Sequence, residues 1–105
     1  MHHITAKVLA ERLAAEPALV VLDVREHWER ALCALPRSLH APMQQVPSLV
    51  GTLDPETEVI IYCHSGIRSQ HAARFLEQQG FKRVGNLSGG IDAWAREVDP
   101  TMARY

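Results

Sequence analysis

Two short apolar runs constrain the fold of this chain more than any other feature of its sequence. They are Leu19–Leu22 and Val59–Tyr62, and each is followed by apolar residues at helical spacing. Strands that are apolar at nearly every position are buried on both faces, as the central strands of parallel sheets are. Runs of this kind that alternate with helical patterns indicate βα units. We therefore predict an α/β fold in which both runs are central strands of a parallel sheet.

The remaining elements are predicted from helix caps, apolar spacing and turn residues. Thr5 can cap a first helix, and Pro17 follows the end of that helix as a stop signal. The other predicted elements are a helix from Arg25 to about Leu32, a weak edge strand at Ser38–Ala41, a helix over Val46–Leu53, an amphipathic helix through Gln70–Gln78 with Gly80 just past its end, a strand at Arg83–Leu87 and a last helix after Gly89 and Gly90. Trp28 and Trp94 are expected to pack on the sheet from their helices. No role is assigned to the histidines that follow Met1.

Length and composition bound the class of protein. A chain of 105 residues has room for one hydrophobic core, so we expect a single domain over residues 1–105. The formal charge of -1, with acidic and basic residues mixed along the chain, offers no basic surface to nucleic acid or to an anionic membrane. Neither a membrane-spanning run nor a signal peptide is recognised, so we expect a cytoplasmic protein. In that compartment Cys33 and Cys63 would remain thiols.

Cys63 stands directly after the second apolar run, where a parallel sheet usually binds its ligands. The loop His64–Arg68 leads from this cysteine straight into the next helix, so its backbone N–H groups and the positive end of the helix dipole face the same point. Gly66 suits such a loop, because a tight turn needs a residue that tolerates positive φ. The sequence therefore predicts a cradle for an anion, with the sulfur of Cys63 at its centre.

The expected fall in the pKa of Cys63 is large enough to favour a reactive thiolate over a buried core cysteine. A free thiol with a pKa near ~8.5 is only about 3% ionised at neutral pH, whereas a fall of about two units makes it mostly thiolate. That fall corresponds to roughly 2.7 kcal/mol, which several backbone donors and a helix dipole can supply. Cysteine is often a plain core residue, but the junction between a strand and a glycine-containing loop favours function. We interpret Cys63 as an activated nucleophile.

The side chains around Cys63 are assigned supporting roles. Arg68 can contact an anionic substrate, but we favour an ion pair with Asp23, which ends the neighbouring apolar strand at the same edge of the sheet. His64 is interpreted as a wall residue with no catalytic role. Ser65 and Ser69 are expected to donate hydrogen bonds and to cap the following helix.

Neither a disulfide nor a metal site is expected. Cys33 is the candidate resolving cysteine for Cys63, but it lies in the connection that leads into a strand start and should therefore fall at the opposite end of the sheet. His27, His40 and His71 show no metal-ligand spacing with either cysteine. We predict no metal and no cofactor.

Three segments, LDVREHWE, YCHSGIRSQHAARFLEQQGF and VGNLSGGIDAW, resemble a single-domain rhodanese in their order and gaps over about Val20 to Trp94. The resemblance implies a five-stranded parallel sheet flanked by helices on both faces. It also implies that Cys63 takes a sulfane sulfur from a small-molecule donor, thiosulfate or a persulfide, and holds that sulfur as a Cys63 persulfide. A thiol, cyanide or a sulfur-accepting protein then receives that sulfur. The matching positions are Cys63 as nucleophile, His64, Ser65, Gly66, Ile67, Arg68 and Ser69 as the substrate-binding loop, and Asp23 and Arg25 as a supporting pair.

The resemblance leaves two alternative functions open, and one segment of the chain departs from the family pattern. The enzymatic alternative is a phosphatase or arsenate reductase, because cell-cycle phosphatases that resemble rhodaneses use the same cysteine. Their loop, however, is one residue longer than the four residues between Cys63 and Arg68. Non-catalytic rhodanese-like modules typically lack this cysteine, which the chain keeps together with Gly66. The segment Cys33–Ser38 stands where many members have Gly-His-Ile-Pro-Gly-Ala, and it retains only the proline. We expect that segment to lie away from Cys63 and to alter loop geometry or partner contacts.

Overall fold

The computed structural model describes residues 1–105. Its elements are, in chain order, β1 (His2–Ile4), α1 (Ala6–Ala15), β2 (Val20–Asp23), α2 (His27–Leu32), β3 (Ser38–His40), the 3-10 helix η1 (Met43–Leu49), β4 (Glu58–Tyr62), α3 (Ile67–Gln78), β5 (Arg83–Leu87) and α4 (Gly90–Glu97). No helix is long and apolar enough to cross a membrane.

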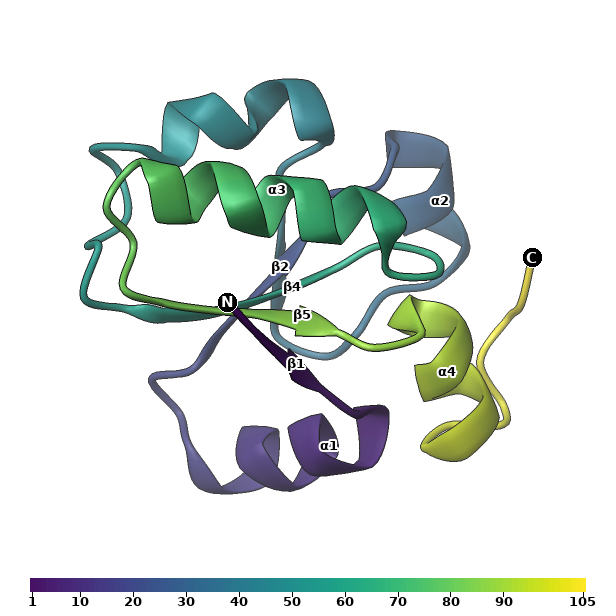
Figure 1. The fold of residues 1–105 in the computed structure, drawn as a ribbon. Helices are drawn as coiled ribbons and strands as arrows, with labels where there is room; N and C mark the ends of the chain where they lie inside the picture. Colours follow the sequence, from purple (N-terminus) through teal and green to yellow (C-terminus); the bar gives the residue numbers. More distant parts are fainter.

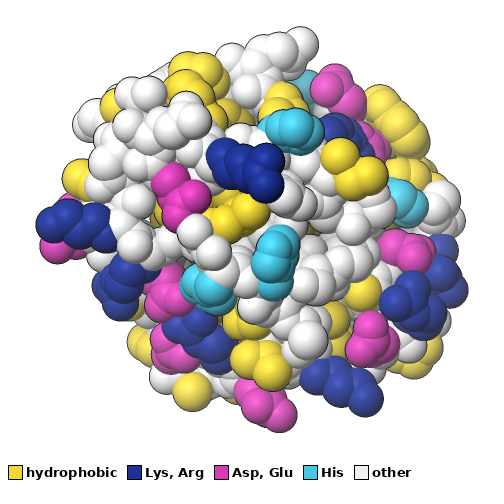
Figure 2. Space-filling view, viewed as in Figure 1, with side chains coloured by type: hydrophobic (Ala, Val, Ile, Leu, Met, Phe, Trp, Pro, Cys, Tyr) yellow, Lys and Arg dark blue, Asp and Glu magenta, His cyan; other side chains and the backbone are white.

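The five strands form one parallel sheet in the order β1-β5-β4-β2-β3. Helices cover both faces, with α3 and η1 on one side and α1 and α4 on the other (Figure 1). The predicted α/β fold with a five-stranded parallel sheet is therefore confirmed. Charged side chains of both signs are interspersed on the face seen in Figure 2, as the mixed charge of the sequence predicts.

The two apolar runs occupy the positions predicted for them. β4 is the central strand, and β2 lies beside it in register, with Val21 opposite Ile60. Residues along β4 alternate between two cores, so that Ile60 packs with α1 and α4 while Ile61 packs with α3 and η1. Both isoleucines are fully buried. Because both faces of the sheet are covered, an apolar side chain is favoured at every position of these strands.

The structure differs from the sequence predictions at three places. The N-terminal strand β1 was not predicted, because of its three residues only Ile4 is buried and no alternating pattern can be recognised. The helix predicted over Val46–Leu53 is the shorter 3-10 helix η1, and Pro47 inside it has no N–H to donate to a longer helical ladder. The prediction that Trp28 packs on the sheet is wrong, since its side chain is 61% exposed, whereas Trp94 is buried as expected.

Candidate active site

Cys63 lies immediately beyond the carboxyl end of the central strand and is 1% exposed. The chain then turns within three residues into α3, whose N-cap is Gly66. Gly66 has φ of 110°, which is the left-handed region that favours glycine. The turn that brings the start of α3 back over the sulfur therefore depends on the glycine that the sequence analysis singled out.

Hydrogen-bond donors surround the sulfur of Cys63. The backbone N–H of Gly66 lies 3.1 Å from Sγ, and the backbone N–H and Oγ of Ser69 lie 3.5 and 3.4 Å from it. Burial raises the pKa of the Cys63 thiol, but the bonds from Ser69, Gly66 and Ser65 outweigh that effect, so the pKa lies below its ordinary value. The start of α3 adds the positive end of its dipole. This arrangement favours an anionic sulfur.

The other loop side chains lie around the cradle in different ways. Ile67 is 68% exposed and Ser65 is also exposed, so neither side chain packs into the core. The ring of His64 lies 4.4 Å from that of Tyr105, and its buried Nδ1 has no hydrogen-bond partner. His64 therefore lines a small pocket with Tyr105, and its role as a wall residue stays a prediction. Ser69 is fully buried and contacts the sulfur rather than serving only as a helix cap.

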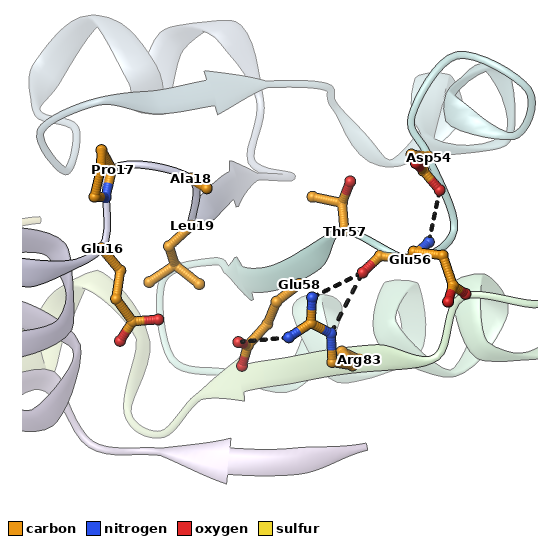
Figure 3. Close-up of a pocket in the computed structure, with 9 residues that line it drawn as sticks. All are labelled: Glu16, Pro17, Ala18, Leu19, Asp54, Glu56, Thr57, Glu58 and Arg83. Carbon is orange, nitrogen blue, oxygen red and sulfur yellow. Dashed lines mark hydrogen bonds and ion pairs between the residues drawn. The ribbon is translucent and has the colours of Figure 1, made fainter.

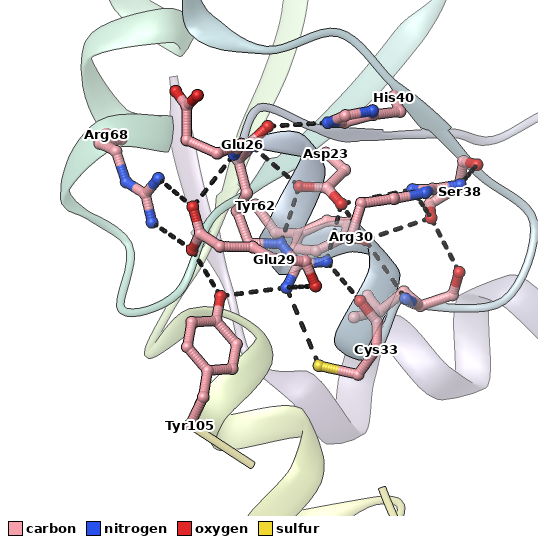
Figure 4. Close-up of polar contacts among 12 residues, drawn as sticks. Asp23, Glu26, Glu29, Arg30, Cys33, Ser38, His40, Tyr62, Arg68 and Tyr105 are labelled. Carbon is pink, nitrogen blue, oxygen red and sulfur yellow. Dashed lines mark hydrogen bonds and ion pairs between the residues drawn. The ribbon is translucent and has the colours of Figure 1, made fainter. Parts of the chain in front are cut away.

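The predicted ion pair between Arg68 and Asp23 is wrong. Arg68 instead donates two hydrogen bonds to the carboxylate of Glu29 in α2, at 2.7 and 2.8 Å (Figure 4). The reason is that Asp23 is already saturated, because Arg25 binds both of its oxygens at 2.9 and 2.8 Å and the Tyr62 hydroxyl donates to it at 3.0 Å. The Arg68 guanidinium lowers the pKa of Glu29 to about 2, against the opposing effect of burial.

Asp23 and Arg25, the predicted supporting pair, are in contact and both fully buried. Arg25 also donates to the carbonyls of Glu29 at 3.4 Å and Cys33 at 2.6 Å, and to the Tyr105 hydroxyl at 3.0 Å. One side chain thus holds β2, α2 and the C-terminal segment together. Arg25 holds the backbone of Glu29 in place, and the Glu29 carboxylate in turn positions Arg68.

The expectation that Cys33 lies at the opposite end of the sheet from Cys63 is wrong. Cys33 caps the C-terminus of α2, and its side chain lines a small pocket together with His64 and Tyr105. The reason is that α2 has only six residues and, at 1.5 Å per residue, carries the chain back by only about 9 Å. The departure from the rhodanese pattern therefore begins near the candidate site. Both cysteines are free thiols.

Several residues of the site were not found by sequence reasoning. Glu29 stands four residues after Arg25 on an exposed helix, a spacing that could have suggested a shared role. Asn86 is a polar residue in an otherwise apolar stretch of β5, which could have marked it as a hydrogen-bonding position. Tyr105 lies in a C-terminal segment with no periodic pattern, and no sequence signal indicated it.

The largest groove lies elsewhere, at the amino ends of the strands. It has a volume of about 490 Å³ and is lined by Glu16, Asp54, Glu58 and Arg83 among others (Figure 3). Arg83 donates to the carbonyl of Glu56, and Glu58 is paired with Arg12 at 2.6 Å. Because Cys63 is at the other end of the sheet, this groove is not the candidate site.

The chain is similar to known proteins over most of its length. A family model described as Rhodanese-like domain matches residues 5–97. A sulfurtransferase of Allochromatium vinosum is 39% identical over 103 residues, which are 98% of this chain and 96% of that protein. A protein named thiosulfate sulfurtransferase, from Coxiella burnetii, is 34% identical over 85 residues, 81% of this chain and 79% of that protein. A crystal structure of a rhodanese-like domain protein from Staphylococcus aureus superimposes with a TM-score of 0.85 at 27% identity, covering 100% of this chain and 99% of that one.

Proposed function

Because the chain belongs to the rhodanese-like domain family, we propose that it is a sulfurtransferase that carries a sulfane sulfur on Cys63. The relatives support sulfurtransferase activity in general. The observation that carries the proposal for this chain is the buried sulfur of Cys63, which faces the N–H groups of Gly66 and Ser69 at the start of α3. These donors favour the thiolate, which is the form of cysteine that reacts as a nucleophile.

The proposed reaction has two halves. In the first, the Cys63 thiolate attacks the outer sulfur of thiosulfate, a new S–S bond forms, and sulfite leaves with the electron pair of the broken S–S bond. In the second, an acceptor thiolate or cyanide attacks the outer sulfur of the persulfide, and Cys63 leaves as a thiolate. This is covalent catalysis of the ping-pong type. The donors of the cradle stabilise the Cys63 thiolate, which is the nucleophile in the first half and the leaving group in the second.

Thiosulfate is proposed as the donor because a relative named for that activity shares 34% identity with the chain. The loop has only four residues between Cys63 and Arg68, one fewer than in the phosphatases. We infer from this length a narrower cradle, which suits one projecting sulfur better than a phosphate group with all its oxygens bonded. The acceptor is proposed to be a thiol, cyanide or a sulfur-accepting protein. We place the reaction in the cytoplasm, where both thiols would stay reduced.

Mass spectrometry after incubation with thiosulfate tests this proposal. We expect the mass of one added sulfur on the peptide that contains Cys63. The addition should be lost in Cys63→Ser and retained in Cys33→Ser, which serves as the matched control. An unmodified protein with an unchanged circular dichroism spectrum would favour a binding module instead. Hydrolysis of aryl phosphates that is lost in Cys63→Ser would favour a phosphatase.

A further inference from the structure

The buried amide of Asn86 connects β5 to the cysteine loop. Asn86 is 2% exposed, its Nδ2 donates to the carbonyl of Gly66 at 3.0 Å, and its Oδ1 accepts from Oγ of Ser69 at 2.5 Å. A carbonyl can only accept a hydrogen bond, so the NH₂ group must face Gly66 and the amide oxygen must face Ser69. It follows that Ser69 is the donor in its contact with Asn86.

Ser69 Oγ therefore has two acceptors for one hydrogen. It lies 2.5 Å from Asn86 Oδ1 and 3.4 Å from Cys63 Sγ, and a hydroxyl group can donate only once. While the hydrogen points to Asn86, Ser69 presents a lone pair to the sulfur, which suits a neutral S–H but not a thiolate. When Cys63 ionises, the hydrogen is drawn toward the sulfur, and the buried oxygen of Asn86 loses its bond.

We propose that Asn86 is a positioning residue that competes with the Cys63 thiolate for the hydroxyl hydrogen of Ser69. This inference rests on the proposed role of Cys63 as the reacting atom. Thiolate formation requires the hydrogen to turn from Asn86 to the sulfur. In the persulfide, the negative charge moves to the outer sulfur, and the hydrogen returns to Asn86. Ser69 thus stabilises the ionised Cys63 by only the difference between two hydrogen bonds.

The competition suits a cysteine that must be both nucleophile and leaving group. Stronger donors lower the pKa of a thiol and make it a better leaving group, but they also make its thiolate a weaker nucleophile. A hydroxyl that donated freely to the sulfur would favour the second half of the reaction at the expense of the first. Asn86 limits that donation while its NH₂ group holds the Gly66 peptide in place.

A double-mutant cycle tests the proposal without any sulfur donor. The thiolate of Cys63 is titrated by its ultraviolet absorbance in a Cys33→Ser background, with Ser69→Ala added to chains that keep Asn86 or carry Asn86→Leu. With Asn86 present, we expect Ser69→Ala to lower the thiolate-to-thiol ratio by less than about threefold, because little net donation is lost. In the Asn86→Leu background the same change should lower the ratio by about tenfold, since Ser69 then donates to sulfur alone.

Asn86→Asp separates the competition from the anchoring of Gly66. This variant keeps an oxygen toward Ser69 but loses the donor to Gly66. Its carboxylate charge raises the pKa of Cys63 whether or not Ser69 is present, so the effect of Ser69→Ala is measured within the Asn86→Asp background, where it should again be small. Equal effects of Ser69→Ala in the Asn86 and Asn86→Leu backgrounds would overturn the proposal. A tenfold fall of the thiolate-to-thiol ratio on Ser69→Ala in the chain that keeps Asn86 would also overturn it, even if Asn86→Leu failed to fold. Because the titration needs no sulfur donor, it distinguishes failure of this proposal from failure of the proposed sulfur transfer.

Discussion

At the scale of single residues, the buried pair of Asp23 and Arg25 supports the candidate site from beneath Glu29. Both side chains are fully buried, and Arg25 binds the carboxylate through two nitrogens. Removing one partner of a buried pair leaves an uncompensated charge in the interior. Loss of the Asp23 carboxylate is therefore expected to disturb the contacts by which Arg25 holds Glu29.

Asp23→Ala is expected to lower the free energy of unfolding by about 3–5 kcal/mol, because the guanidinium of Arg25 would stay buried without its counter-ion. Urea denaturation at neutral pH measures this loss. Glu56→Gln is the control, since Glu56 pairs with Lys82 at the surface, where both side chains are more than half exposed. Equal stability changes in the two variants would show that Asp23 is not the essential counter-ion.

Glu29 is expected to make the free energy of unfolding depend on pH in the acid range. Its pKa is lowered from 4.5 to about 2 in the folded chain, chiefly by the hydrogen bonds from Arg68. A carboxyl whose pKa is lowered on folding stabilises the fold above its unfolded pKa and loses that contribution as the pH falls through the folded pKa. We expect Glu29→Gln to be less stable than the unmodified chain by about 1–3 kcal/mol at pH 7, a range that allows for the partial exposure of Arg68.

Denaturation curves across the acid range check this expectation. The difference between the two proteins should shrink as the pH falls from 4.5 toward 2. A difference that stayed constant over that range would mean that the carboxylate charge of Glu29 does not contribute to stability.

At the scale of elements, α4 holds the cysteine loop from the side opposite to α3. The N–H groups of Ile91 and Asp92 donate to the carbonyls of Cys63 and His64 at 2.9 and 3.1 Å. Gly90 makes this contact possible, because a Cβ at that position would lie 2.4 Å from the His64 carbonyl oxygen and 2.5 Å from that of Cys63. The first turn of α4 therefore sets the position of the cradle backbone.

Gly90→Ala is expected to displace the backbone of Cys63 and His64 and to slow persulfide formation at least about tenfold, because small displacements of a reacting group are costly. The rate of sulfur addition from thiosulfate measures the effect. Gly80→Ala is the matched control: Gly80 also has positive φ, at 98°, but a Cβ there meets nothing within 4 Å. The control should lose some stability and keep its rate. A Gly90→Ala variant with an unchanged rate would contradict this role of α4.

Elements with a strong local signal were predicted from the sequence, and those held by distant contacts were not. Thr5 accepts a hydrogen bond from the N–H of Val8, as expected of a helix cap, and the strand before Cys63 is a continuous apolar run. By contrast, β1 exists because β5 offers it an edge to pair with. The partner of Arg68 depends on how α2 packs beside α3, which no local pattern specifies. The position of Cys63 was predictable because strand order and loop chemistry agree there.

At the scale of the whole molecule, the C-terminal segment adds long-range contacts to the site. It runs back beside α4 toward α2 (Figure 1), and the Tyr105 hydroxyl donates to Glu29 at 2.6 Å. The sheet separates two apolar cores, one beneath α1 and α4 and the other beneath α3 and η1. Each core is closed by helices from different parts of the chain, so neither face of the sheet is formed by a local segment alone.

The two cores are expected to contribute to stability independently. Ile4 of β1 packs in one core and Ile61 of β4 in the other, on opposite faces and two strands apart. Ile4→Val and Ile61→Val should each lower the free energy of unfolding by about 0.5–1.5 kcal/mol, because each removes one buried methyl group. Without shared contacts, the loss in the double variant should equal the sum of the single losses within about 0.5 kcal/mol. Urea denaturation of the four proteins tests this, and a double variant that departs from the sum by more than about 1 kcal/mol would show that the sheet transmits strain between its faces.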